Sequence, residues 1–165
     1  MESIATWFGS TLGQFLPAEL VIFLISLLPI LELRGGLVVA SLLQVPLLTA
    51  IPICILGNIL PIPFILLFIK KIFKWMKRFP RLAKLVDKLE ARAMRKSDGI
   101  ARGEFWGLVL FVGIPLPMTG AWTGSLIAAL LEMDLKKAVL ADLLGIAIAT
   151  IIVSILSYGL LGLFV

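Results

Sequence analysis

The apolar residues of this chain fall into two long regions, about 17–69 and 105–165, with a polar and basic segment between them. In each region an interrupted apolar stretch comes first and a long apolar stretch follows, over about 46–69 and 136–164. A helix needs about 20 apolar residues to cross a bilayer, so both long stretches predict transmembrane helices. Three prolines are expected to kink the first of these helices: Pro52, Pro61 and Pro63. The pattern predicts an all-α integral membrane protein.

The two regions are related by an internal repeat at an offset of 88 residues, with no gap needed. Matching positions include Leu28-Pro29 with Leu116-Pro117, Gly36 with Gly124, and Leu56-Gly57 with Leu144-Gly145. Leucine matches are common in an apolar chain, whereas an aligned proline and two aligned glycines are not. The sequence therefore predicts two repeats, 17–69 and 103–165, within a single membrane domain over 1–165.

The first apolar stretch of each repeat is interrupted by proline and glycine, at Pro29–Gly36 and Pro115–Gly124. If each interrupted stretch is a complete span, the protein has four transmembrane helices. If each is a re-entrant hairpin, two half-helices enter and leave on the same side of the membrane. Interrupted backbone is tolerated at membrane depth where it is buried in protein or lines a wet cavity.

The distribution of positive charge favours the hairpins. Twelve of the 15 basic residues lie between Lys70 and Arg102, and basic segments beside membrane helices stay in the cytoplasm. Only the hairpin arrangement also brings Lys136 and Lys137 inside, and it leaves both uncharged termini outside. Each repeat then crosses the membrane once, in opposite directions, and such inverted repeats are a transporter architecture. The expected location is the plasma or inner membrane.

The basic linker, 70–102, is expected to join the repeats on the cytoplasmic side. Within Arg81–Lys96 five apolar residues form one helical stripe among cations: Leu82, Leu85, Val86, Leu89 and Ala93. This spacing predicts an amphipathic helix on the inner membrane surface, with Phe73, Trp75 and Phe79 at the interface. Acidic lipid headgroups lie closer than nucleic acid, so no nucleic-acid partner is expected. Residues 1–15 carry no Lys or Arg, which argues against a signal peptide, and predict either an interfacial segment or a flank of the first apolar region.

Composition excludes several kinds of site. The chain is 61% hydrophobic and 15% charged, and its mean hydropathy is +1.12. It has no histidine and one cysteine, Cys54, which rules out a Cys/His zinc site and Ser-His or Cys-His nucleophiles. Neither an enzyme, a metal nor a cofactor is expected. Proton coupling would have to use carboxylates, and the candidates are Glu32, Asp142 and Glu19.

The first interruption carries two charges inside an apolar region, Glu32 and Arg34. A charge at mid-membrane costs at least about 2.5–3.5 kcal/mol, so such residues usually face a wet cavity or a partner. Gly35 and Gly36 are expected to break the helix, so that a half-helix over about 37–44 starts with free N–H groups beside Arg34. Two positive features at one point favour an anion such as phosphate or carboxylate. A structural Glu32–Arg34 ion pair is the alternative.

The second interruption is uncharged and is expected to meet the first near mid-membrane. Its candidate substrate contacts are hydroxyls, glycine N–H groups and an apolar wall: Pro117, Thr119, Gly120, Trp122, Thr123 and Gly124. Asp142 lies in the first turns of the last predicted helix. It could equally be a structural cap of that helix or a functional carboxylate. Asn58 is expected to make a packing hydrogen bond.

The motifs Glu-Leu-Arg-Gly-Gly at 32–36 and Gly-Ile-Pro-Leu-Pro-Met-Thr-Gly-Ala-Trp-Thr-Gly at 113–124 resemble those of the small multidrug export family. The resemblance covers about 15–160. That family is itself similar to the DedA superfamily, some of whose members translocate phospholipid-like molecules through membrane carboxylates and arginines. By character, Glu32 and Arg34 match those residues.

Three functions remain open at this stage. The first is a transporter or flippase for an anionic, phosphate-bearing, lipid-like substrate, with Arg34 in the anion site and Glu32 as gate or proton carrier. The second is an exporter of lipophilic cations, with Glu32 as the cation and proton site and Trp122 as a stacking wall. The third is a membrane scaffold that transports nothing. A homodimer is expected, because two hairpins and two spans make a thin wall around a polar cavity.

Overall fold

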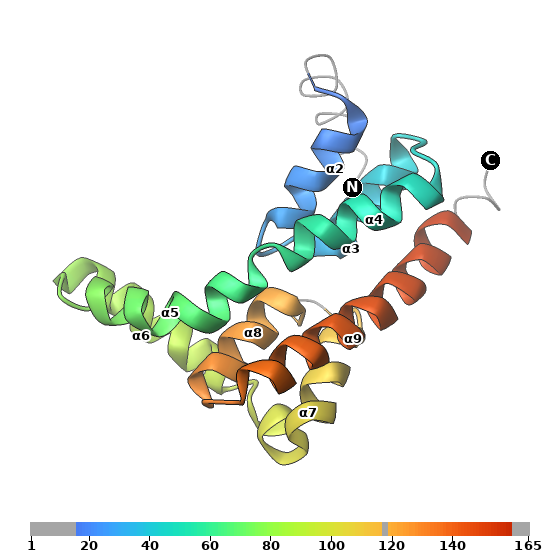
Figure 1. Ribbon diagram of the computed structural model, residues 1–165. Coiled ribbons are helices and arrows are strands. Elements are labelled where there is room, and N and C mark those ends of the chain that lie inside the picture. The colour runs from blue at the N-terminus through green and yellow to red at the C-terminus, as the bar shows by residue number, and fades with distance from the viewer. Residues whose placement is uncertain (1–15, 117–118, 160–165) are drawn as a thin grey trace. The chain divides into compact units, whose positions relative to one another are not determined.

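All regular structure in the described part of the chain is helical (Figure 1). The computed structural model describes residues 16–116 and 119–159. The helices in chain order are α2 (Ala18–Leu27), α3 (Glu32–Leu42), α4 (Leu47–Ile59), α5 (Ile62–Met76), α6 (Pro80–Met94), α7 (Asp98–Gly113), α8 (Ala121–Leu130), α9 (Leu135–Ser154) and the π-helical turn η2 (Ile155–Gly159).

Two helical runs are long and apolar enough to cross a membrane, as the sequence predicts. They are Leu47–Met76, with 30 residues, and Leu135–Gly159, with 25 residues. The first continues past the predicted end at residue 69 and takes in Lys70, Lys71 and Lys74. Of the three prolines, Pro52 lies inside α4, while Pro61 separates α4 from α5 because its ring cannot continue the hydrogen-bond ladder.

The predicted repeat reappears in the helix boundaries. At an offset of 88 residues α3 and α8 both end, at Leu42 and Leu130, and α4 and α9 both begin, at Leu47 and Leu135. The turn between them is also repeated, because Gln44 and Glu132 have positive φ values of 56° and 57°. In both turns three consecutive N–H groups bond the carbonyls of the last helical turn, which is how a left-handed residue closes a helix.

The ungapped alignment is wrong for the first helix of each repeat. Gly57 packs against Phe23 and Ser26, whereas Gly145 packs against Val109 and Val112, and these partners are 86 residues apart. The ends of α2 and α7, at residues 27 and 113, show the same offset. The second repeat therefore has two more residues than the first in the loop after its first helix.

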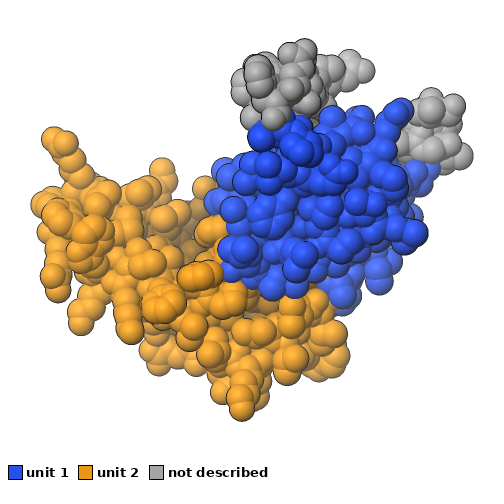
Figure 2. Space-filling view, turned by 45° about the horizontal axis from the view of Figure 1, so that its top comes forward, with its two compact units in different colours: residues 1–60, 147–165 blue, residues 61–146 orange. Residues whose placement is uncertain are grey.

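The chain divides into two compact units, one of residues 1–60 and 147–165 and one of residues 61–146 (Figure 2). In the first unit α2, α3 and α4 pack against one another and η2 packs on α3. Two hydrogen bonds hold η2 there. The Ser41 hydroxyl donates to the Ser157 carbonyl at 3.0 Å, and the Tyr158 hydroxyl donates to the Val45 carbonyl at 2.9 Å.

In the second unit α8 is central and packs against α5, α6 and α7. Lys70 near the end of α5 donates to Glu132, the residue that closes α8, at 2.6 Å. Lys70 and Tyr158 are 88 residues apart and so occupy equivalent positions near the ends of the two long apolar runs. Lys70 bonds the turn after α8, and Tyr158 bonds the turn after α3. The membrane orientation of the repeats stays a prediction.

Candidate functional site

Glu32 and Arg34 occupy the first turn of α3, in the first unit. Glu32 is 6% exposed and has a positive φ of 52°, while Arg34 is half-buried. The charge of Glu32 acts on Arg34 electrostatically. The buried Glu32 carboxylate and the half-buried Arg34 guanidinium are suited to an ion pair that stabilises this turn. They also form a polar position that a substrate could share.

The expectation that Gly35 and Gly36 break the helix is wrong. The helix already begins at Glu32, and the preceding turn covers Leu28–Leu31. The Glu32 N–H donates to the Leu28 carbonyl at 2.9 Å, and the Gly35 N–H donates to the Leu31 carbonyl at 2.8 Å. These two N–H groups are therefore used within the chain and do not form the expected anion site.

Gly36 serves close packing instead. It is buried where α3 meets α2 and α4. A Cβ atom there would overlap the Ser26 hydroxyl oxygen, lie 2.9 Å from Cys54 Sγ and lie 3.2 Å from the Ile22 carbonyl oxygen. A glycine at this position lets the three helices approach more closely than any side chain would permit.

The second interruption lies in the other unit. Gly120 precedes α8 in extended backbone, and the half-buried Trp122 and Thr123 lie in its first turn. The Thr119 hydroxyl bonds carbonyls of its own loop, those of Ile114 at 3.0 Å and Leu116 at 2.9 Å. Pro117 lies outside the described residues. The predicted meeting of the two interruptions stays a prediction, because each is described within its own unit.

Asp142 is the most deeply buried carboxylate in the described part of the chain. It lies two turns into α9 with no exposed surface, so it is not a helix cap. The Ser125 hydroxyl of α8 donates to Asp142 Oδ2 at 2.6 Å. A Cβ atom on the neighbouring Gly124 would lie 3.5 Å from Asp142 Oδ1 and 2.7 Å from Val112. Gly124 thus permits the close packing of α8 on Val112 of α7.

The repeat pairs Asp142 with Cys54, since the two are 88 residues apart. Cys54 is buried beside Gly36 as Asp142 is beside Gly124. The same packing position therefore holds a thiol in one repeat and a carboxylate in the other. The offset visible in the sequence could have found this pairing, whereas Ser125 as the partner of Asp142 could not be found without the packing of α8 on α9.

The two remaining polar candidates differ in burial. Glu19 is exposed in the first turn of α2, which makes it a surface residue of the protein. Asn58 is buried in α4, and its Oδ1 accepts no hydrogen bond within the described part of the chain. The amide oxygen therefore does not take part in the predicted packing hydrogen bond of Asn58.

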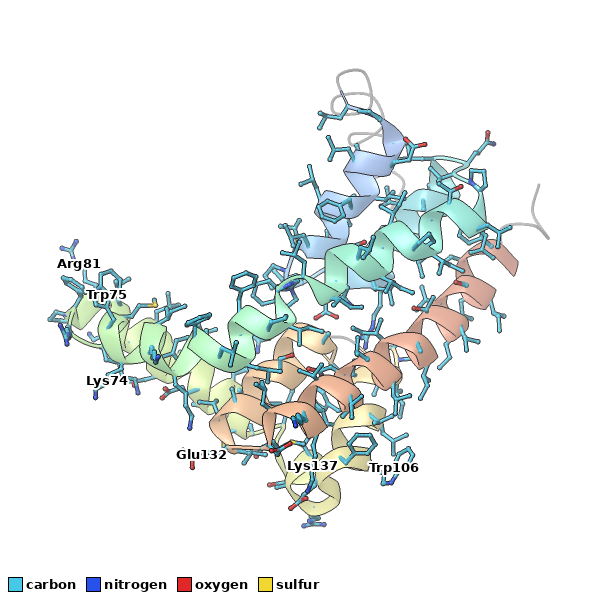
Figure 3. The ribbon with its side chains drawn as sticks, viewed as in Figure 1. Lys74, Trp75, Arg81, Trp106, Glu132 and Lys137 are labelled. Atoms are coloured by element: carbon cyan, nitrogen blue, oxygen red, sulfur yellow. The ribbon has the colours of Figure 1, made fainter. Side chains whose placement is uncertain are left out.

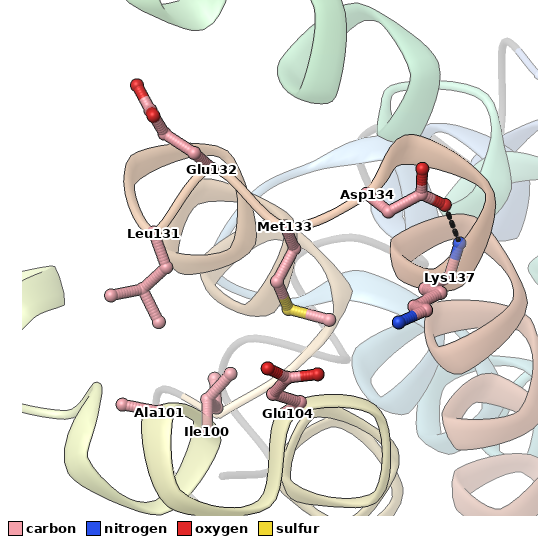
Figure 4. Close-up of a pocket in the computed structure, with 8 residues that line it drawn as sticks. All are labelled: Ile100, Ala101, Glu104, Leu131, Glu132, Met133, Asp134 and Lys137. Atoms are coloured by element: carbon pink, nitrogen blue, oxygen red, sulfur yellow. Dashed lines mark hydrogen bonds between the residues drawn. The ribbon is translucent and has the colours of Figure 1, made fainter.

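A cavity of about 300 Å³ lies in the second unit, between the start of α7 and the turn before α9 (Figure 4). Figure 4 shows Met133 pointing into the cavity and Glu132 pointing away from it. Three acids lie along its rim. Glu132 bonds Lys70, and Asp134 accepts the Lys137 N–H at 3.1 Å as the cap of α9. The third, Glu104, is exposed. The cavity therefore adds no candidate to the site.

A family model described as "Putative small multi-drug export protein" matches residues 32–152. The match includes residues 32–36 of the first interruption, the whole second interruption, the basic linker and Asp142. No curated protein and no solved structure matches the chain. Because the match covers well over half of the 165 residues, the chain belongs to the family of small multidrug export proteins.

Proposed function

We propose that the protein is a proton-coupled membrane exporter of lipophilic cations, with Asp142 as the principal proton-binding carboxylate and Glu32 as the second. The family description names small multidrug export, and the two long apolar runs suit a membrane protein. The proposal concerns the coupling ion, the substrate class and the residues that bind them.

The observation that carries the proposal is the burial of Asp142. Its carboxylate has no exposed surface in a helix that is apolar enough to span a membrane. Ionisable groups at such positions are costly and commonly belong to ion or proton pathways. The Ser125 hydroxyl orients one oxygen, and the other oxygen is buried beside Gly124. A carboxyl group held in this way can bind a proton in one state and a cation in another.

Glu32 supports the same chemistry from the first repeat. It is buried, and it acts electrostatically on Arg34. A cationic substrate entering near Glu32 would compete with Arg34 for the carboxylate, so Arg34 would modulate affinity without being required for transport.

The test is efflux of tetraphenylphosphonium from proteoliposomes, with a pH-sensitive dye reporting proton movement. Asp142→Asn keeps the size of the side chain and the Ser125 partner, and it should abolish substrate-driven proton movement. Glu19→Gln is the matched control, because it neutralises an exposed carboxylate and should leave transport unchanged. Proton movement in Asp142→Asn equal to that of the parent protein would remove Asp142 from the mechanism.

A second candidate is a transporter or flippase for an anionic, phosphate-bearing substrate. The observation that favours it is Arg34, half-buried in the first turn of α3. The two candidates make opposite predictions for Arg34→Ala. The anionic substrate would be favoured if the parent protein translocated phospholipid without cation efflux and Arg34→Ala lost that translocation. Intact cation efflux in Arg34→Ala would favour the exporter. A scaffold that transports nothing would show neither activity.

We also propose that each repeat is a re-entrant hairpin plus one span, with the two repeats inverted in the membrane. The repeated helix bounds and turns are compatible with this arrangement, which keeps Lys136 and the basic linker cytoplasmic. Single cysteines introduced at Lys136 and near the N-terminus, in a Cys54→Ser background, test it with impermeant reagents. Lys136 should react from the cytoplasmic side and the N-terminus from outside. Four full spans would place both sites in the opposite compartments.

A homodimer is proposed on grounds of size, since two hairpins and two spans from 165 residues would make a thin wall around a polar transport cavity. Light scattering on the purified protein in detergent tests it. A mass of one chain of 18.0 kDa, after subtraction of detergent, would contradict the dimer.

A further inference from the structure

The C-terminal end of α3 meets η2 without a charged residue from either element. The carbonyl groups at this end of a helix carry a partial negative charge, which Lys or Arg commonly complements. The last turn of α3, the turn that follows it and η2 contain no charged residue. The charged residues labelled in Figure 3, among them Lys74, Arg81 and Lys137, belong to the second unit. The negative end of α3 therefore has no cationic side chain of its own.

Two buried serine hydroxyls lie on the η2 side of this junction. Ser154, the last residue of α9, is 8% exposed, and Ser157 in η2 is 6% exposed. They are three residues apart and so occupy neighbouring positions on the helix surface. Ile155 and Leu156 are exposed, which places Ser157 on the side of η2 that packs on α3.

Neither hydroxyl has a hydrogen-bond partner within the described part of the chain. The Ser154 and Ser157 hydroxyls differ in this from the buried hydroxyl of Ser26, which donates to the Ile22 carbonyl at 2.7 Å. A buried hydroxyl without a partner is unfavourable, because it has lost its water and gained nothing in return. Two such groups side by side indicate a bound group that the chain itself does not supply.

The junction also offers oxygens on the α3 side, held in place by hydrogen bonds. The Ser41 hydroxyl donates to the Ser157 carbonyl at 3.0 Å, so its own oxygen can still accept. Three carbonyls in the last turn of α3 accept N–H groups of the following turn, and each keeps a second lone pair. The Tyr158 hydroxyl fixes η2 to the Val45 carbonyl. The π-helical form of η2 fits this reading, because such turns are frequent at functional sites.

We propose that the junction of α3 and η2 is a binding site for a sodium ion, with the hydroxyl oxygens of Ser41, Ser154 and Ser157 among its ligands. Sites for Ca²⁺ and Mg²⁺ use carboxylates, whereas the residues of this junction offer neutral oxygens, which suit a monovalent cation. Helix C-terminal ends and backbone carbonyls bind Na⁺ in membrane transporters. The site goes beyond the proposed function, because it uses neither Asp142 nor Glu32.

The test compares thermal unfolding of the full-length protein in detergent with NaCl, KCl or choline chloride at equal ionic strength. NaCl should raise the Tm above its value in the other two salts, and the rise should saturate. At about ten times the dissociation constant the rise should be roughly 3–6 °C. Equal Tm values in the three salts would overturn the proposal, since water would then satisfy the two hydroxyls. An equal rise with KCl would overturn the assignment to sodium.

Serine variants locate the ion. Ser154→Ala and Ser157→Ala should each reduce the rise produced by NaCl without lowering the Tm in choline chloride, because each removes a hydroxyl that has no partner there. Ser97→Ala is the matched control. Ser97 is also buried, but its hydroxyl donates to the Met94 carbonyl at 2.7 Å, so this variant should keep the full rise. A rise that survives both substitutions together would overturn the proposal.

A second measurement does not depend on the folding of any variant. Radioactive sodium should bind the purified parent protein saturably and be displaced by unlabelled NaCl but not by choline chloride. Absence of saturable binding would overturn the proposal. Binding that is lost in Asp142→Asn and kept in the serine variants would also overturn it, because the ion would then lie at the proposed proton site. Neither measurement involves transport, so failure here is distinguishable from failure of the proposed function.

Discussion

Replacement of Gly36 by alanine tests whether close helix packing, rather than a helix break, is the role of the Gly35-Gly36 pair. The new Cβ would overlap the Ser26 hydroxyl oxygen and press on Cys54 Sγ at 2.9 Å. The Ser26 oxygen cannot turn away without losing its 2.7 Å bond to the Ile22 carbonyl. We expect Gly36→Ala to destabilise the protein.

The magnitude follows from two opposing terms. Adding a methyl group to a packed core costs about 1–3 kcal/mol. Replacing glycine by alanine inside a helix returns about 1 kcal/mol. The net loss should be up to about 2 kcal/mol, which corresponds to a fall in Tm of up to roughly 8 °C for a chain of this length. If Gly36 instead broke the helix, alanine would be destabilising because of the backbone conformation, and the loss would be the same whichever residue occupied position 26.

The assay is thermal unfolding in detergent, followed by tryptophan fluorescence. Ser26→Ala removes the overlapping oxygen, so the double variant should recover most of the loss, with a coupling free energy of about 1 kcal/mol. Gly103→Ala is the matched control, because no atom lies within 4 Å of its Cβ, and it should be neutral or slightly stabilising. Strictly additive losses for Gly36→Ala and Ser26→Ala would refute the packing argument.

Three further predictions concern the bonds at the helix ends and their dependence on pH. Tyr158→Phe removes the bond to the Val45 carbonyl and should cost about 1 kcal/mol in the unfolding assay. The bond from Lys70 holds the pKa of Glu132 below its ordinary value of 4.5, so this bond stabilises the fold at neutral pH and is lost as the pH falls through the lowered pKa. Glu132→Gln should therefore flatten the acid side of a plot of Tm against pH, and an unchanged acid side would contradict it. The acids of α6 raise the pKa of Lys77 above 10.5, so its contribution is complete below that pH and lost above it. Lys77→Met should flatten only the alkaline side.

Much of the fold was predictable because it depends on local pattern. The two long apolar runs, the basic linker and the amphipathic α6 follow from hydropathy read along the chain, and all reappear as helices. The repeat was visible in the sequence because proline and glycine are rare enough that their alignment by chance is improbable. The offset of 88 residues recurs between the ends of α3 and α8 and between the starts of α4 and α9.

The register of the first helix in each repeat was not predictable in the same way. Over α2 the sequence favours the offset of 88 residues, where Leu20, Val21 and Phe23 match identical residues, whereas at 86 residues only Leu24 does. The packing against Gly57 and Gly145 and the ends of α2 and α7 establish the offset of 86, since the first helix of each repeat lies against one of these glycines. The two extra residues lie in a loop, where an insertion costs little free energy.

The sequence by itself determined that this protein is built of apolar helices in two related halves, and that Glu32, Arg34 and Asp142 are charges within apolar regions. Hydropathy and charge are properties of each residue, so they can be read without a fold. The tertiary structure decided what each glycine and charge contacts: Gly36 packs against Ser26 and Cys54 instead of breaking α3, and Ser125 bonds Asp142. Those contacts depend on how helices distant in sequence pack together, and no local pattern contains that information.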